Sequence, residues 1–287
     1  MSGGDGLAGA AFMEVMGNLP PLPGPGDRWA LFLDVDGTLV AIEPTPEAVR
    51  VEPALRLLLE RLAAANDGAL ALVSGRSLAS IDAVFQPLRL PAAGLHGWER
   101  RRGDGTLAPT AEPIAILAPL RPLLLAFAAA RPGLRVEDKG GSLALHYRLA
   151  PHYAAVVCQR AREIAAAEPQ LRLIEGRKVV EFVPRGSHKG AAIADFLAEP
   201  PFAGRMPVYA GDDTTDEDGF AAVNRLGGLS IKVANPETRG RHASQARHRP
   251  PSIAALHGWL AALAQRLETG EILAKRDRAE RQASVGR

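Results

Sequence analysis

Two short acidic motifs contain the residue types that phosphoryl or metal chemistry needs. The first is Asp34-Val35-Asp36-Gly37-Thr38, which directly follows the apolar run Trp29-Ala30-Leu31-Phe32-Leu33. The second is Gly211-Asp212-Asp213-Thr214-Thr215-Asp216-Glu217, which directly follows Val208-Tyr209-Ala210. Carboxylates in such a setting can act as a nucleophile, as a general acid or as ligands of a hard cation.

The apolar run before each motif predicts a strand that is buried on both faces of a parallel sheet. Residues i and i+2 of an extended chain point the same way, so Asp34 and Asp36 would present both carboxylates to one space. The carboxyl ends of the strands line the ligand crevice of open α/β sheets, and two carboxylates there repel each other unless a cation compensates. The alternative is a turn or a helix cap, because Asp and Gly are also common in turns.

Two further polar residues are expected at the same sheet edge. Ser74 follows the apolar run at residues 69–73, and Lys189 lies in the first turn of a helix predicted over residues 187–197, with Ser187 as its expected cap. A lysine at a helix N-terminus is unfavourable unless an anion lies nearby. Taken alone, Ser74 would be a helix cap and Lys189 a surface lysine, whereas with the acidic motifs they suit Mg²⁺ and a phosphate. The neighbouring His188 receives no role.

Hydrophobic periodicity predicts the elements that would position these residues. Strands and helices alternate at residues 29–33, 53–65, 69–73 and 78–85, and again at residues 187–197, 207–210, 214–224, 230–233 and 252–267. This alternation predicts an α/β fold with a doubly wound, Rossmann-like parallel sheet. Thr214 and Glu217 have the spacing of a capping box for the helix at residues 214–224.

The middle of the chain has a different pattern. Residues 134–139 and 142–148 flank Gly140-Gly141, and residues 171–175 and 178–183 flank Gly176-Arg177, so each pair predicts an antiparallel hairpin. Helices are expected at residues 152–168 and at residues 114–130, the latter kinked or split by Pro119 and Pro122. The predicted organisation is a flexible leader at 1–27, a parallel-sheet core at 28–111 and 185–268, an inserted α/β domain at 112–184, and a charged, disordered tail at 269–287.

Composition argues against several other classes of protein. The 34 Lys and Arg residues nearly balance the 32 Asp and Glu residues, so no nucleic-acid partner is expected. The chain has no run of 18 apolar residues, and we therefore expect no membrane span. Cys158 is the one cysteine, which excludes an internal disulfide and fits a reducing compartment. The cytoplasm is the expected location, since the N-terminus lacks the pattern of a secretion signal.

Together the motifs around Asp34, Ser74, Lys189 and Asp212 resemble the four motifs of the haloacid dehalogenase (HAD) superfamily of phosphatases. Between residues 31 and 267 the chain further resembles the bacterial trehalose-6-phosphate phosphatase family. The segments that carry this second resemblance are Leu72-Val73-Ser74-Gly75-Arg76-Ser77, Ala93-Gly94-Leu95-His96-Gly97-Trp98-Glu99-Arg100-Arg101, Ala144-Leu145-His146-Tyr147-Arg148, Val179-Val180-Glu181 and Pro184-Arg185-Gly186. The inserted unit is similar to the α/β cap of the superfamily.

The resemblance implies Mg²⁺-dependent hydrolysis of trehalose 6-phosphate to trehalose and phosphate. Asp34 would attack phosphorus and form an aspartyl-phosphate, and Asp36 would protonate the leaving oxygen and then activate water. Ser74 and Lys189 would hold the phosphoryl oxygens. A functional link to a trehalose-phosphate synthase is also implied.

The same resemblance implies the ligands of the cation and of the sugar. Mg²⁺ would be held by Asp34, the Asp36 backbone carbonyl and Asp212, with Asp213 and Asp216 in support. The residues expected to bind the substrate are Arg76, His96, Gly97, Glu137, Lys139 and Glu181. Without the resemblance, the charges at 137 and 139 would be interpreted as a solvated face of a hairpin.

Two alternatives keep the fold and change the outcome. The chain could be another HAD sugar-phosphate phosphatase, or a phosphosugar mutase that uses the same aspartyl-phosphate. It could also be a non-catalytic domain that binds a sugar phosphate for regulation. Such a domain should have lost Asp34, Asp36 or Lys189, and all three are present.

Overall fold

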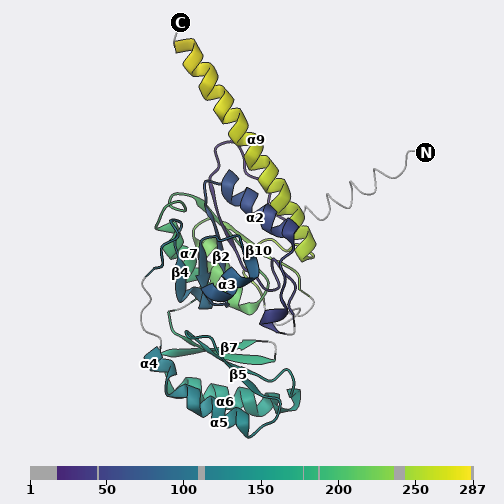
Figure 1. Cartoon of the computed structure of the whole chain (residues 1–287), viewed down its shortest axis with the longest axis vertical. Helices are drawn as coiled ribbons and strands as arrows, with labels where there is room; N and C mark the ends of the chain where they lie inside the picture. Colours follow the sequence, from purple (N-terminus) through teal and green to yellow (C-terminus); the bar gives the residue numbers. More distant parts are fainter. Residues whose placement is uncertain are drawn as a thin grey trace, which may run out of the picture.

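The computed structural model describes residues 18–43, 45–108, 114–176, 178–186, 188–235 and 243–285, and this part of the chain forms two β-sheets (Figure 1). The larger sheet has the strand order β10-β9-β1-β2-β3-β4, and all neighbouring strands are parallel except β3 and β4. The strands of this sheet are β1 (Trp29–Leu33), β2 (Leu70–Val73), β3 (Ala92–Gly94), β4 (Glu99–Arg101), β9 (Met206–Gly211) and β10 (Leu229–Lys232).

Strand β1 lies inside the larger sheet and is buried at every residue. Alternate residues face opposite layers: Trp29, Leu31 and Leu33 pack with α2, α3 and α9, whereas Ala30 and Phe32 pack with α7 and α8. These helices are α2 (Pro53–Ala65), α3 (Leu78–Phe85), α7 (Lys189–Leu197), α8 (Glu217–Arg225) and α9 (Ile253–Val285). Helices therefore cover both faces of a mostly parallel sheet, which confirms the predicted doubly wound α/β fold.

The smaller sheet follows β4 in the chain and is antiparallel, in the order β5-β6-β8-β7. Its strands are β5 (Arg135–Asp138), β6 (Leu143–His146), β7 (Leu171–Gly176) and β8 (Val179–Pro184). Helices α5 (Leu120–Ala129) and α6 (Ala154–Ala167) pack on one face, and the other face is turned toward the larger sheet (Figure 1). Both predicted hairpins are confirmed. We call the part of the molecule built on this sheet the cap and the part built on the larger sheet the core.

The helical stretch before β5 is interrupted as expected. Helix α4 (Ile114–Leu117) ends and α5 begins on either side of Pro119. Pro122 lies in the first turn of α5, where a missing N–H costs little. The sequence does not predict β3 and β4, because three residues are too few to show an alternating pattern.

The expectation of a flexible leader is wrong for its described part. Leu19 is buried in the core, and the Pro20 carbonyl accepts a hydrogen bond of 2.8 Å from the Trp259 indole N–H of α9. The Pro23 carbonyl accepts another of 3.1 Å from Arg266. Gly and Pro argue against regular secondary structure, but they do not prevent packing of an extended segment. Residues 1–17 lie outside the described residues.

The C-terminal tail also differs from the expectation of disorder. Helix α9 does not end near residue 267 but continues to Val285 and projects beyond the core (Figure 1). Residues 268–285 contain no proline and are rich in Glu, Ala, Lys and Arg, which are strong helix formers. Charge alone therefore did not distinguish a helix from a disordered tail. Residues 286 and 287 lie outside the described residues.

None of the helices in the described ranges combines the length and the apolar composition that crossing a lipid bilayer requires.

Candidate active site

The first acidic motif forms a tight turn at the carboxyl end of β1. The Val35 carbonyl accepts hydrogen bonds from the N–H groups of residues 38, 39 and 40. Gly37 has φ +86°, and a Cβ there would lie 2.2 Å from Asp212 Oδ2. Only glycine fits, because it tolerates positive φ and leaves room for the Asp212 carboxylate. The turn leaves Asp34 buried and the Asp36 side chain 33% exposed.

The second acidic motif lies beside the first because β9 pairs with β1. The two strands are parallel, with Leu33 opposite Ala210, so both motifs begin at the same edge of the sheet. One carboxylate oxygen from each of Asp34, Asp212 and Asp216 lies within 4.8 Å of the others, and all three residues are buried. The structure thus brings the predicted metal ligands of the two motifs together.

Lys189 contacts two of these carboxylates. Its Nζ donates to Asp34 Oδ1 at 2.7 Å and to Asp216 Oδ1 at 2.6 Å, and its side chain is only 3% exposed. His188, which received no role from the sequence, is the N-cap of α7, and its Nδ1 accepts from the Ala191 N–H. The expected cap, Ser187, lies outside the described residues.

Asp216 lines the pocket, and four hydrogen bonds hold its carboxylate in place. Its Oδ2 accepts from the backbone N–H groups of Asp212 and Asp213, and its Oδ1 accepts from Lys189 and from the Tyr209 hydroxyl. The capping box is therefore formed by Asp213 and Asp216, and the predicted box of Thr214 and Glu217 is wrong. A 3-10 turn at Thr214–Asp216 precedes α8, which moves the true cap one residue earlier.

Burial and mutual repulsion make the ionised forms of Asp34 and Asp212 unfavourable unless positive charge lies nearby. Burial, only partly offset by Lys189, raises the pKa of Asp34 to about 7. Burial together with Asp34 and Asp216 raises the pKa of Asp212 to about 9. Burial opposes the charge of Lys189 as well, but Asp216 and Asp34 outweigh it and raise its pKa. Oxygen ligands in this arrangement fit a hard divalent cation.

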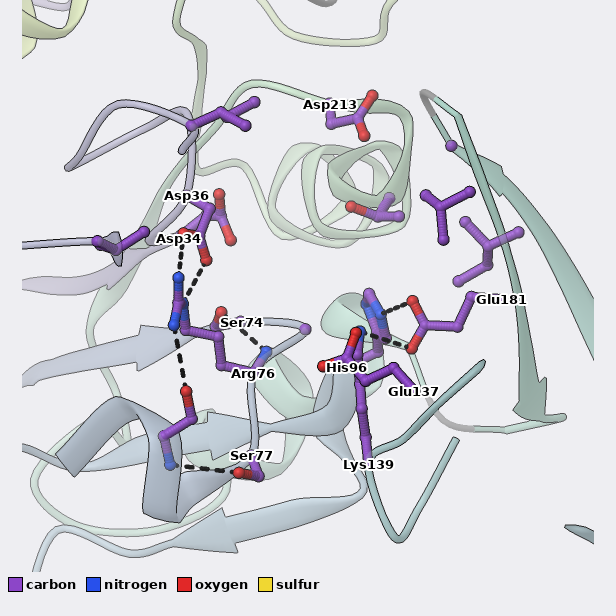
Figure 2. A pocket seen from close by; sticks show the side chains of 18 of the residues that line it. Asp34, Asp36, Ser74, Arg76, Ser77, His96, Glu137, Lys139, Glu181 and Asp213 are labelled. Atoms are coloured by element: carbon purple, nitrogen blue, oxygen red, sulfur yellow. Dashed lines mark hydrogen bonds and ion pairs between the residues drawn. The ribbon is translucent and has the colours of Figure 1, made fainter. Parts of the chain in front are cut away.

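The loop after β2 provides Ser74 and Arg76. Ser74 is buried, and its Oγ accepts a hydrogen bond from the Arg76 N–H. The Arg76 guanidinium binds both oxygens of Asp36, at 2.6 and 2.7 Å, and also donates to Ser80 Oγ (Figure 2). Arg76 thus holds the carboxylate that the sequence assigns to proton transfer.

His96 and Gly97 lie in the short 3-10 turn between β3 and β4. The His96 side chain is buried in the wall of the pocket. Gly97 does not line the pocket; with φ +105°, a Cβ there would approach Ala192 of α7 to 3.0 Å. Its position indicates close packing of the turn against α7 rather than contact with a ligand.

The cap residues expected to bind the substrate face the same pocket. Lys139 Nζ lies 3.1 Å from Glu181 Oε1, and His146 Nε2 lies 2.8 Å from Glu137 Oε2. The hydrogen bond with His146 lowers the pKa of Glu137. Burial would raise the pKa of the Glu181 carboxyl, but Lys139 opposes this effect, and the pKa of Glu181 lies below its usual range. The charges at 137 and 139 therefore line a pocket instead of forming a freely solvated face.

Residues from both sheets enclose a cavity of about 530 Å³. Every predicted site residue except Gly97 lines it. Figure 2 shows Asp34, Asp36, Ser74 and Arg76 across the pocket from Glu137, Lys139 and Glu181, with His96 beside the cap residues.

Sequence reasoning missed three residues that contact the site: Tyr209, which donates to Asp216, Asn235, whose Nδ2 donates to Asp212 Oδ2 at 2.8 Å, and His146, which pairs with Glu137. Each residue had a signal in the sequence. Tyr209 carries a hydroxyl within an apolar strand, and Asn235 carries an amide shortly after β10, the next parallel strand. His146 is the last residue of β6, within the cap strand that the sequence predicts at residues 142–148.

The fold is the one found in solved phosphatases, among them a member of the HAD superfamily. The C-terminal domain of a Candida albicans trehalose-6-phosphate phosphatase has the same fold, with a TM-score of 0.73, 19% identity and coverage of 88% of this chain and 97% of that one. BT1666 from Bacteroides thetaiotaomicron, described among phosphatases of the HAD superfamily, has a TM-score of 0.57 at 16% identity, covering 85% of this chain and 98% of that one.

Sequence relatives narrow the class to one family. The family model described as trehalose-phosphatase matches residues 32–254. A trehalose-6-phosphate phosphatase of Escherichia coli is 45% identical over 233 residues, which cover 81% of this chain and 85% of that protein. A probable trehalose-phosphate phosphatase of Sinorhizobium fredii is 46% identical over 83% of this chain and 88% of its own length. The chain belongs to the trehalose-phosphatase family and is a phosphoric monoester hydrolase, as the resemblance implied.

The turn at Gly37 gives a first test of the site. Gly37→Ala should lower kcat/KM at least about 100-fold, because the new Cβ must displace Asp212 and small displacements of catalytic groups cost that much. Gly105→Ala is the matched control, since Gly105 has φ +83° with nothing within 4 Å of its Cβ position. It should show only the modest loss of stability that positive φ imposes on alanine. Equal activity in the two variants would contradict the packing of Gly37 on Asp212.

Proposed function

We propose that this enzyme hydrolyses trehalose 6-phosphate to trehalose and phosphate through an aspartyl-phosphate on Asp34. The observation that carries the proposal is a single pocket with two chemically different ends. At one end Asp34 lies against Lys189 beside Asp212, and at the other the cap supplies charged hydrogen-bonding groups. The names of the relatives from Escherichia coli and Sinorhizobium fredii support the choice of sugar.

The first step is attack of an Asp34 oxygen on phosphorus. A carboxylate that approaches a phosphate dianion at about 4 Å meets repulsion of several kcal/mol at an effective dielectric constant near 20. Lys189 offsets part of this charge from within contact of Asp34, and the Ser74 hydroxyl can donate to a phosphoryl oxygen. The P–O bond to the sugar breaks as the bond to Asp34 forms.

Asp36 moves the protons in this proposal. It lies two residues beyond the nucleophile at the edge of the pocket, where it can reach the leaving oxygen of the sugar. It donates a proton to that oxygen in the first step and accepts one from water in the second, when water attacks phosphorus and the bond from phosphorus to Asp34 breaks, which releases phosphate and restores the Asp34 carboxylate. Arg76 contacts both oxygens of the Asp36 carboxylate, and one of these contacts must open before that oxygen can carry the donated proton.

The donor set fits Mg²⁺. Asp34, Asp212 and the Asp36 carbonyl would hold the ion, with Asp213 and Asp216 in support, since the Asp216 oxygens already accept from Lys189, Tyr209 and two backbone N–H groups. When bound, Mg²⁺ supplies positive charge beside the phosphoryl group and keeps both carboxylates ionised. The raised pKa values of Asp34 and Asp212 fit a site built to contain such a cation.

The cap end recognises the sugar. Glu137, Lys139 and Glu181 offer charged acceptors and donors, which make strong hydrogen bonds to hydroxyl groups. Glu181 is buried and already oriented by Lys139 and Ser142, so little side-chain entropy is lost when it binds. Arg76 and His96 line the same pocket from the core side. The near-neutral net charge of +2 and the single cysteine suit a cytoplasmic enzyme of sugar metabolism that acts after a trehalose-phosphate synthase.

A substrate panel tests the proposed function. Purified enzyme with Mg²⁺ should release phosphate from trehalose 6-phosphate at least about tenfold faster than from glucose 6-phosphate or sucrose 6-phosphate, because only the disaccharide of the right shape satisfies the cap residues. Equal rates on all three would remove the trehalose assignment and leave a general sugar phosphatase. Chelation by EDTA should abolish turnover and added Mg²⁺ should restore it; full activity after chelation would contradict the cation requirement.

The nucleophile has its own test. Asp34→Asn should lower kcat at least about 10³-fold, because an amide oxygen cannot form the acyl-phosphate. Asp195→Asn, at a side chain that is 62% exposed, is the matched control for the same chemical change and should retain full activity. Acid-quenched wild-type enzyme should also carry one phosphate on the Asp34 peptide by mass spectrometry. Normal turnover by the Asp34 variant would overturn the mechanism.

A further inference from the structure

His96 is a buried side chain whose ring nitrogens make no hydrogen bond within the described part of the chain. Its side chain is 6% exposed and lines the pocket. A buried polar ring without a hydrogen bond is costly, and such groups in native proteins call for a specific explanation. The surroundings of the ring supply one.

The local backbone is built to hold this ring in place. Leu95 and His96 have φ of +49° and +59°, a conformation that side chains other than glycine rarely adopt. Two hydrogen bonds hold it: the Leu95 N–H donates to the Arg76 carbonyl at 2.8 Å, and the His96 N–H donates to the Ser74 carbonyl at 3.0 Å. Gly75 leaves the space that the ring occupies, since a Cβ there would lie 2.9 Å from it. Strain of this kind clusters at functional sites.

Glu181 of the cap faces this ring. Its Oε1 accepts from two groups of the cap, Ser142 Oγ at 2.6 Å and Lys139 Nζ at 3.1 Å. Its Oε2 is turned to the core and lies 3.5 Å from His96 Nε2 (Figure 2). That distance is longer than a good hydrogen bond, but an imidazole N–H attracts a buried carboxylate whether the ring is neutral or charged.

Other contacts between core and cap lie elsewhere. Gly141 of the hairpin packs against Leu95 and Trp98, where a Cβ would approach their side chains to 2.7 and 3.1 Å. Arg172 of β7 binds Asp218 of α8 at 2.5 Å, and neither residue lines the pocket. The contact between His96 and Glu181 is thus a core–cap contact inside the pocket, and it adjoins the loop that carries Ser74.

We propose that His96 is a positioning residue that fixes the orientation of the Glu181 carboxylate relative to the loop after β2, which carries Ser74. Lys139 and Ser142 hold one oxygen from the cap, and His96 holds the other from the core. The distance between the sugar-binding carboxylate and Ser74 is then set by a contact across the two sheets. The inference rests on the proposed function, because it assumes that Glu181 binds the sugar.

A double-mutant cycle tests this coupling. His96→Asn suits the site, because asparagine tolerates positive φ better than most residues but is too short to reach Glu181. Both His96→Asn and Glu181→Gln should raise KM for trehalose 6-phosphate about tenfold, with a smaller effect on kcat. The double variant should show about the same tenfold increase, since contacting residues that act through one interaction are not additive. The loss on 4-nitrophenyl phosphate, which is too small to span the pocket, should be at least about tenfold smaller.

The pair Arg172→Ala and Glu181→Gln is the matched control, since it combines a core–cap contact outside the pocket with the same cap change. In the double variant of this control pair, the effects of the two substitutions on KM should multiply. Multiplying effects for His96→Asn and Glu181→Gln, or an equal loss on both substrates, would overturn the proposal.

A second variant displaces the ring without removing it. Gly75→Ala introduces a Cβ against His96 and should raise KM in the same non-additive way with Glu181→Gln, which keeps the test available if His96→Asn does not fold. Additive behaviour there would also contradict the proposal. The cycle is measured on whichever sugar phosphate the wild-type enzyme prefers, so a failure of the trehalose assignment is distinguished from a failure of the coupling.

Discussion

The contact of the Lys189 ammonium with two buried carboxylates is the interaction on which the core end of the pocket depends. It joins the start of α7 to the end of β1 through Asp34 and to the turn before α8 through Asp216. Removing one partner of a buried ion pair costs about 3–5 kcal/mol, so the pair fixes these three elements relative to one another. Within the described residues, Asp212 adds a third buried carboxylate to the same cluster, and its raised pKa indicates that the ionised form needs further positive charge nearby.

The cap depends on that end of the pocket through a few contacts between core and cap. The cap sheet has its own apolar core under α5 and α6. What the core adds is position: Gly141 packs on the turn at residues 95–97, Arg172 reaches α8, and Glu181 faces His96. The cap wall of the pocket is therefore tied to the backbone of the loop that carries Ser74, whose carbonyl accepts a hydrogen bond from the His96 N–H.

Much of the core could be predicted because the carboxyl ends of parallel strands lie at the same edge of a sheet. Apolar runs that end in Asp34, Ser74 and Asp212 had to meet at one side of the sheet, and they do. The capping box at Asp213 could not be predicted, since several acidic and hydroxyl residues compete locally within one turn. The approach of Glu181 to His96 depends on tertiary packing that no local pattern encodes, whereas Glu137 and His146 lie diagonally across the predicted hairpin of β5 and β6. The packed leader at residues 18–27 was missed for the same reason, because its partner is Trp259 at the other end of the chain.

The central claim is that the buried aspartates form a site for one divalent cation, and calorimetric titration of Mg²⁺ into the full chain tests it most directly. The wild-type protein should bind one Mg²⁺ per chain in a saturable manner, since Asp34 and Asp212 become favourable as ionised ligands only with the cation present. Asp212→Asn should weaken binding at least about tenfold, while Asp195→Asn, at an exposed position, should leave it unchanged. Absence of saturable binding to the wild-type protein, or equal affinity in the Asp212 variant, would contradict the account.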